Sequence, residues 1–178
     1  MTSELISSQT LTSWSGTIDF TNIPQTHDDL MLVMSLRTPS TSGSGVYTPI
    51  VLPNATGSIS QRTLRGNGAT ATSSSNSGLT INGMFKVPGG KNTANTFCST
   101  EVYIPNYAGN QAKSMSVTSV EENNTMTDEH MVDTLVGAAL WSLSDPITSL
   151  RITSNNQGLQ SESFVANSSF YLYGFSHS

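Results

Sequence analysis

Residues 14–37 read WSGTIDFTNIPQTHDDLMLVMSLR, and this stretch decides the fold class. Its first seven residues alternate large and polar side chains, with Trp14, Ile18 and Phe20 on one side. A period of two is typical of a half-buried strand. A proline and several turn-forming residues follow, and residues 30–37 then form a continuous apolar run. That run fits a buried strand or a short helix, and its length and flanking turns favour a strand.

Similar segments recur along the rest of the chain, separated by Gly, Pro, Asn and Ser. We expect strands at residues 46–52, 79–87, 97–104, 112–120, 147–154 and 168–176, whereas residues 135–143 fit either a helical turn or a strand. The segment at residues 168–176 is apolar on both faces, which is typical of a strand in the middle of a sheet or at an interface. Residues 38–45 and 66–78 offer almost nothing to bury and are expected to be loops. The total is about nine to eleven strands.

The composition excludes a mostly helical protein. Only 11% of the residues are charged, and 29 Ser, 23 Thr and 14 Asn replace the usual helix formers. These residue types suit strands, turns and caps. We predict an all-β fold, an antiparallel, jelly-roll-like β-sandwich in a single domain at residues 14–178. Residues 1–13 are an N-terminal arm or a first edge strand. The expected core is Trp14, Ile18, Phe20, Leu30, Leu32, Val102, Ile104, Trp141, Ile152, Phe170 and Leu172.

The charge balance argues against two classes of partner. Seven basic residues against twelve acidic ones give a net charge of −5, and the basic residues are scattered. Binding to nucleic acid needs clustered Lys and Arg, and so does a polybasic membrane anchor. We therefore expect neither nucleic acid nor a membrane as a partner. No signal peptide or transmembrane run is recognisable, and Cys98 is the single cysteine, so we expect synthesis in a host cytoplasm without disulfides.

No motif in the sequence indicates catalysis or a cofactor. Cys98 is expected to be a buried, inert thiol, and His27, His130 and His177 have no metal-ligand spacing. The adjacent pairs Asp28-Asp29 and Glu121-Glu122 should point to opposite faces of an extended chain, which disfavours a pair of catalytic carboxylates. Asp128, Glu129, His130 and Asp133 could hold calcium in a loop, but the order of an EF-hand loop is missing and a solvated loop is favoured. We expect a non-enzyme with no catalytic, cofactor-binding or metal residues.

Four segments in order resemble a β-sandwich domain of tailed-bacteriophage structural proteins, notably those of cyanophages and marine phages. They are residues 17–37, Val102 to Tyr107, Trp141 to Ile152, and residues 168–175. Such domains serve as capsid decoration proteins, head fibres and tail-fibre tips. The resemblance implies a virion structural protein, and we expect a decoration (cement) protein on the capsid exterior. Its partners would be the major capsid protein and further copies of itself, a homotrimer by the same resemblance, with residues 2–11 as a contacting arm.

The alternative is a tail-fibre or head-fibre tip that binds host surface carbohydrate. β-Sandwiches with long loops often hold glycans through exposed aromatic rings together with acidic or amide groups. The candidate rings are Trp14, Tyr47, Tyr103, Tyr107, Trp141, Tyr171 and Tyr173. Strand alternation turns several of them inward, so a core role is favoured for most.

Overall fold

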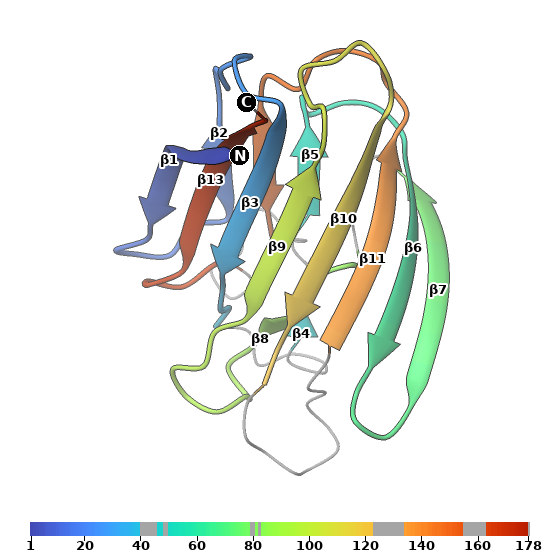
Figure 1. Cartoon of the computed structure of the whole chain (residues 1–178). Helices are drawn as coiled ribbons and strands as arrows, with labels where there is room; N and C mark the ends of the chain where they lie inside the picture. The colour runs from blue at the N-terminus through green and yellow to red at the C-terminus, as the bar shows by residue number, and fades with distance from the viewer. Residues whose placement is uncertain are drawn as a thin grey trace.

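Two antiparallel sheets of unequal size build the computed structural model of the chain, which describes residues 1–39, 46–47, 50–78, 81, 83–122, 134–154 and 163–177. The large sheet has eight strands in the order β1-β13-β3-β9-β10-β11-β6-β7, and the small sheet has three in the order β2-β12-β5. The small sheet lies behind the large one in Figure 1 and covers part of one of its faces, here called the inner face. The described residues contain no helix. The all-β, antiparallel sandwich prediction is confirmed.

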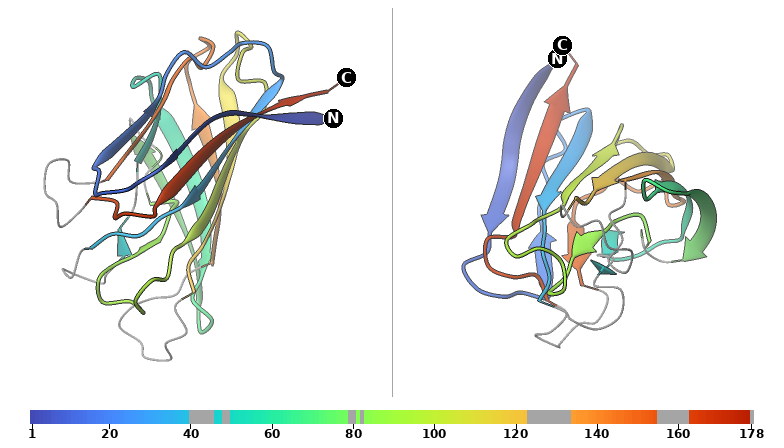
Figure 2. Two further views of the ribbon diagram at one scale, coloured as in Figure 1. Left: turned by 90° about the vertical axis from the view of Figure 1, so that its left-hand side faces the viewer. Right: turned by 90° about the horizontal axis from the view of Figure 1, so that it is seen from below.

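The strands of the large sheet come from the whole length of the chain. They are β1 (Thr2–Thr10), β3 (Asp29–Ser35), β6 (Ile59–Gly66), β7 (Ala71–Gly78), β9 (Ser99–Ile104), β10 (Lys113–Val120), β11 (Thr134–Trp141) and β13 (Ser169–Ser176). The small sheet contains β2 (Thr17–Phe20), β5 (Ile50–Pro53) and β12 (Leu150–Thr153), and β4 (Val46–Tyr47) pairs with β8 (Val87–Pro88). Because β1 pairs with β13, the two chain ends lie side by side (Figure 2).

Burial alternates along the strands as a sheet covered on one face requires. In β10 and β11 every second residue is buried and the others are exposed. Ten of the eleven expected core residues are buried, and Trp141 is fully buried with its indole N–H donating to the Thr56 carbonyl at 2.9 Å. Gly57 lies directly against that ring, since a Cβ atom there would stand 2.2 Å from Trp141 Nε1. Its φ of +102° also suits glycine alone.

Trp14 is the core prediction that was wrong. Its side chain is 50% exposed. Strand β2 begins only at Thr17, so the alternation read from residue 14 does not extend through the preceding turn. Residues 1–13, expected as an arm or an edge strand, contain β1, which forms one edge of the large sheet.

The predictions for residues 59–87 need correction, and the alternative left open at residues 135–143 is decided. Residues 66–78 were expected to be a loop, yet β7 pairs with β6 over its full length. Strand β6 itself was not expected at all. Of residues 79–87, Leu79, Thr80 and Asn82 lie outside the described residues; Ile81 forms one isolated bridge with Val51, and only Val87 is in a strand. Residues 135–143, left open between helix and strand, contain most of β11.

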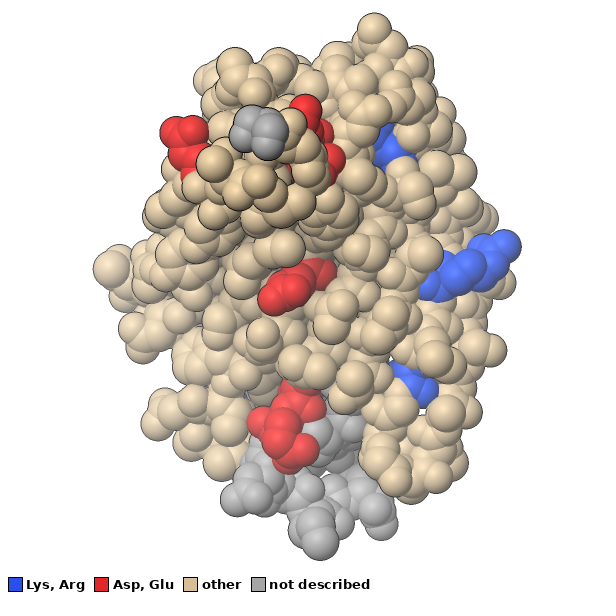
Figure 3. Space-filling view, viewed as in Figure 1, with Lys and Arg blue, Asp and Glu red and all other residues tan. Residues whose placement is uncertain are grey.

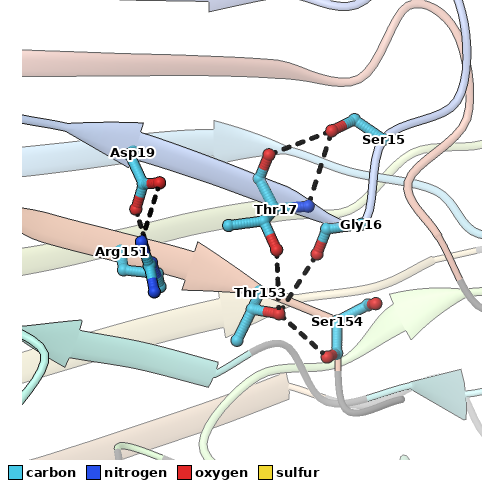
Figure 4. Close-up of polar contacts among 7 residues, drawn as sticks. All are labelled: Ser15, Gly16, Thr17, Asp19, Arg151, Thr153 and Ser154. Carbon is cyan, nitrogen blue, oxygen red and sulfur yellow. Dashed lines mark hydrogen bonds and ion pairs between the residues drawn. The ribbon is translucent and has the colours of Figure 1, made fainter. Parts of the chain in front are cut away.

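Polar contacts tie the edge of the small sheet together. Arg151 on β12 donates two hydrogen bonds, of 2.6 and 3.1 Å, to the carboxylate of Asp19 on β2 (Figure 4). Two residues further along β12, the Thr153 hydroxyl contacts the Thr17 hydroxyl and the Gly16 carbonyl. The ion pair is exposed, so it adds little to stability; the register of the strands is fixed by their buried faces.

Candidate binding surfaces

The outer face of the large sheet carries an apolar patch, formed by Leu64, Val120, Val136, Ala138 and Leu140. The four larger side chains are 38–59% exposed. Val136 on β11 stands directly opposite Leu64 on β6, and Ala138 and Leu140 continue along the same face of β11. A hollow of about 250 Å³ lies beside Ala138 and Leu140. Contiguous exposed apolar side chains of this kind mark protein contact sites.

Charged groups are sparse on this face. Figure 3 views it directly, and most of the surface belongs to uncharged residues. The few acidic groups lie on the left and in the centre of the view, and the basic groups lie on the right. The patch lies over β11 and β6, on the right of the view (Figure 1), where Arg62 stands opposite Ala138. A partner that covers the patch therefore removes few charges from water besides that of Arg62, and removing a charge is costly when it stays unpaired.

A polar groove lies on the inner face beside β6 and β7. It has a volume of about 270 Å³ and is lined mainly by Gln61, Thr63, Ser74 and Asn76. A smaller hollow of about 120 Å³ continues beside Arg65 and Thr72. The described lining residues present amide and hydroxyl groups, which can both donate and accept hydrogen bonds, together with Arg65, and none of these residues is aromatic. Such a groove suits a hydroxyl-rich ligand better than an apolar one.

A carboxylate cluster holds the C-terminus. The Asp29 side chain, 8% exposed, accepts hydrogen bonds from the Tyr103 hydroxyl, from the Asn106 N–H at 2.9 Å and from His177 Nε2 at 2.6 Å. Asp28 accepts a hydrogen bond from the His177 main-chain N–H at 2.6 Å. Adjacent Asp28 and Asp29 were expected to diverge, but both reach His177, because Asp28 precedes β3 and is not part of the strand.

The protonation of Asp29 is tied to folding. Burial alone would raise the pKa of Asp29, but the hydrogen bonds from His177, Tyr103 and Asn106 hold that pKa below its usual value. The same contact, together with burial, raises the pKa of Tyr103 to about 12. A depressed carboxyl pKa contributes stability above the unfolded-state pKa of about 3.9, and this contribution is lost as the pH falls through the folded-state value.

We therefore expect Asp29→Asn to lower the free energy of unfolding at pH 7 by about 2 kcal/mol, the usual size for hydrogen bonds to a charged group. At pH 3 the difference from the wild type should shrink, because the wild-type carboxyl then begins to protonate. Urea unfolding at both pH values measures this. Asp19→Asn, which breaks an exposed pair, is the control and should change stability by less than about 1 kcal/mol. If Asp29→Asn and Asp19→Asn lower the free energy of unfolding equally at pH 7, the hydrogen bonds to the Asp29 carboxylate do not have the stabilising role proposed for them.

Among the described residues, the remaining candidates of the sequence do not assemble into a reactive site. Cys98 is 1% exposed, and burial raises the pKa of its thiol to about 11, which agrees with an inert thiol. Among the described residues no group of three His, Cys, Asp or Glu side chains is placed to hold a metal ion, and no helix has the length and apolarity to cross a bilayer. The weighed calcium loop, from Asp128 to Asp133, lies outside the described residues.

Apart from one adjacent pair, the aromatic candidates for glycan binding are dispersed. Trp141 and Tyr107 are fully buried. Tyr171 and Tyr173 stack on each other, half-buried on the outer face, with ring centroids 6.5 Å apart. Tyr103 is half-buried and bonded to Asp29, Trp14 is exposed in the turn before β2, and the side chain of Tyr47 lies outside the described residues. No two of the described rings lie on loops together, so stacking on a sugar has no prepared platform in the described residues.

The two surface features were missed because both depend on the β6–β7 hairpin. Leu64 of the patch and every lining residue of the groove except Gly83 belong to residues 59–78 or their turn. One local signal for this hairpin exists: Asn67-Gly68 lies between two eight-residue segments, and Asn-Gly is a strong hairpin turn. The polarity of residues 71–78 concealed it.

Comparison with known proteins adds little to this geometry. No protein-family model matches the chain, and no curated protein matches its sequence. Among solved structures, it is similar to SCP-B, a member of the eqolisin family of peptidases in complex with a tripeptide (8% identity, TM-score 0.24), and to Scytalido-glutamic peptidase with a peptide-based transition-state analogue (9%, TM-score 0.23). Each alignment covers 94% of this chain, which spans 65% and 66% of those chains. Scores this low carry no argument about function.

Proposed function

We propose that the protein is a non-enzymatic structural protein of a tailed-phage virion that binds the outer surface of the head through the major capsid protein. The apolar patch on the outer face of the large sheet is the observation that carries this proposal. Val136 and Leu64 lie side by side and exposed to water on this face. A partner that covers them buries their apolar area, which stabilises the complex by roughly 25 cal/mol per Å². The phage context itself comes from the sequence resemblance.

Attachment through a broad, weakly charged sheet face fits such a role. Many copies crowd on a shell, and a small net charge limits the repulsion between them. The fold needs no disulfide, since Cys98 is free, so it forms in a reducing cytoplasm before the particle is released.

The patch can be tested by charge insertion. Leu64→Lys and Val136→Lys are each expected to weaken binding to purified heads lacking this protein by at least about tenfold, because central contact residues carry most of an interface's energy. Co-sedimentation measures the binding. Ser169→Lys is the matched control on the same face of β13, four strand spacings or about 19 Å from β11, and should bind normally. Undiminished binding by both patch variants would reject the attachment face.

A second candidate function, recognition of host surface carbohydrate by a fibre tip, is favoured by the polar groove. Amide and hydroxyl groups from Gln61, Thr63 and Asn76 suit sugar hydroxyls. The two functions differ in location, so immunogold labelling of intact particles separates them. Label over the head supports the capsid role. Label at fibre tips, with oligosaccharide binding that Asn76→Ala abolishes, supports the second candidate and overturns the first.

A further inference from the structure

Strand β7 is a regular strand that buries no side chain. All eight residues, Ala71–Gly78, are exposed, yet they pair with β6 in eight consecutive positions without a register shift. Ordering a residue costs roughly 1–2 kcal/mol of backbone entropy, and this strand recovers none of it by apolar burial. Within one copy it is held by main-chain bonds to β6 and by short polar contacts such as that between Thr63 and Ser74, at 2.5 Å.

The turn between β6 and β7 determines which main-chain N–H and C=O groups of β7 face β6 and which face the open edge. The Asn67 N–H donates to the Thr70 carbonyl at 3.2 Å, which makes this pair a hydrogen-bonded one. Bonded and non-bonded pairs alternate along an antiparallel ladder, so the next pair, Gly66 with Ala71, is non-bonded. The main-chain N–H and C=O groups of Ala71, Ser73, Ser75 and Ser77 therefore point away from β6. In the described part of the chain no strand pairs with them, and the Ser77 N–H donates to the side-chain Oδ1 of its neighbour Asn76 at 2.8 Å, a bond that a second strand would replace.

The two edges of the large sheet differ in how they are protected. Natural edge strands avoid unwanted pairing through charges, prolines, bulges or shortness. Strand β1 carries Glu4 and a register shift between Leu5 and Ser7. Strand β7 is eight residues long, has no charge and no proline, and runs without a bulge. Its open edge is therefore suited to receive another strand.

We propose that β7 pairs with β7 of a second copy of this chain, across a two-fold axis that passes through Ser74, so that the two large sheets become continuous. Such an axis, perpendicular to the sheet, keeps the inner faces of both copies on one side. Opposed residues must then lie on the same face, which restricts the register. Centring on Ser74 sets Ala71 opposite Ser77 and Ser73 opposite Ser75, and it engages all four outward-bonding residues of each strand.

The side chains of β7 favour its own copy as the occupant. The contact is isologous, so each residue needs a partner within the same eight residues. The proposed register sets Ser74 against Ser74 and Thr72 against Asn76, which are hydroxyl and amide groups that can bond across strands. No like charges oppose each other, because β7 has none. This contact is independent of the virion role, and it would join the trimers expected from the resemblance in pairs.

A disulfide trap tests the register. Ser74→Cys places two thiols at the axis in a non-bonded pair with a Cα separation of about 4.5 Å, within the range of a disulfide. We expect a covalent dimer after mild oxidation. Thr72→Cys is the matched control: its two copies would stand four residues apart, about 13 Å, and should stay monomeric on a non-reducing gel. Cys98 is buried and should not react in either variant. Equal cross-linking of both variants, or none in Ser74→Cys, would overturn the proposal.

The oligomeric mass provides a second, independent test. Ser75→Pro removes an N–H that points to the open edge and leaves the ladder to β6 intact, as prolines on edge strands do. We expect light scattering at micromolar concentration to show half the wild-type mass. Ser75→Ala keeps the N–H and should keep the full mass. If wild type and Ser75→Pro have the same mass, β7 is not the contact between copies.

Discussion

Replacing Lys113 with alanine is expected to lower the free energy of unfolding by about 3–5 kcal/mol, since it leaves three carbonyls without their donor and opens a cavity. Lys113 is 1% exposed at the start of β10. Its ammonium donates to the carbonyls of Gly109 and Ser144, at 2.7 and 3.0 Å, and to that of Asp145. It also lies 5.4 Å from the ring centroid of Trp141. Burial lowers the pKa of Lys113, and the charge of Asp145 partly opposes this.

Urea unfolding of two variants separates the causes of this loss. Lys113→Met fills most of the volume but donates no hydrogen bond, so its stability should lie between those of the wild type and Lys113→Ala. Lys91→Ala removes an exposed lysine and should change stability by less than about 0.5 kcal/mol. If Lys113→Ala lowers the free energy of unfolding by less than about 1 kcal/mol, the three carbonyls find other donors. The Lys113 ammonium is then not what joins Gly109 to residues 144–145.

Arg37→Lys is expected to cost about 2–3 kcal/mol, although it conserves the charge, because one ammonium cannot replace the planar guanidinium fork. Arg37 follows β3 and donates five hydrogen bonds of 2.9–3.2 Å to residues 89–96. Four go to carbonyls, those of Gly89, Asn92, Thr93 and Thr96. The side chain thus organises a connection that has no strand of its own.

Hydrogen exchange locates the effect of this substitution. The N–H groups of Asn92 and Thr96 donate within the same turn and should exchange at least about tenfold faster in Arg37→Lys, as expected for local opening that is easier by 1.4 kcal/mol or more. Protection in β10 should fall only by the global loss of stability. Arg62→Lys, on the exposed face of β6, is the control and should change neither. Unchanged exchange at residues 89–96 in Arg37→Lys would show that the turn holds its shape without the fork.

Local patterns were sufficient for several strands with one buried face, although β6, which also has one, was not expected and β11 was left open. The apolar run at residues 30–37 and the closing segment at 168–176 both form strands next to each other, and ten expected core residues are buried. Alternation works there because a shift by one residue would turn every apolar side chain of a strand into water. Trp14 escaped the rule because it lies before β2, where only an isolated bridge between Ser15 and Phe164 forms. The residue types around Trp14 do not show at which residue the pairing of β2 begins.

By itself the sequence determined the fold class, the scarcity of charge and the buried position of Cys98, because each depends on residue type and on neighbours a few positions away. The tertiary structure alone decided three features. Asp29 meets His177 across 148 residues, Arg37 reaches a turn more than fifty residues away, and β7 forms a strand although it buries nothing. Hydrogen bonds to main-chain groups are available to any sequence and leave no periodic trace. Only the strand pairing in the tertiary structure shows which polar segments form strands, and therefore which edges and faces can receive a partner.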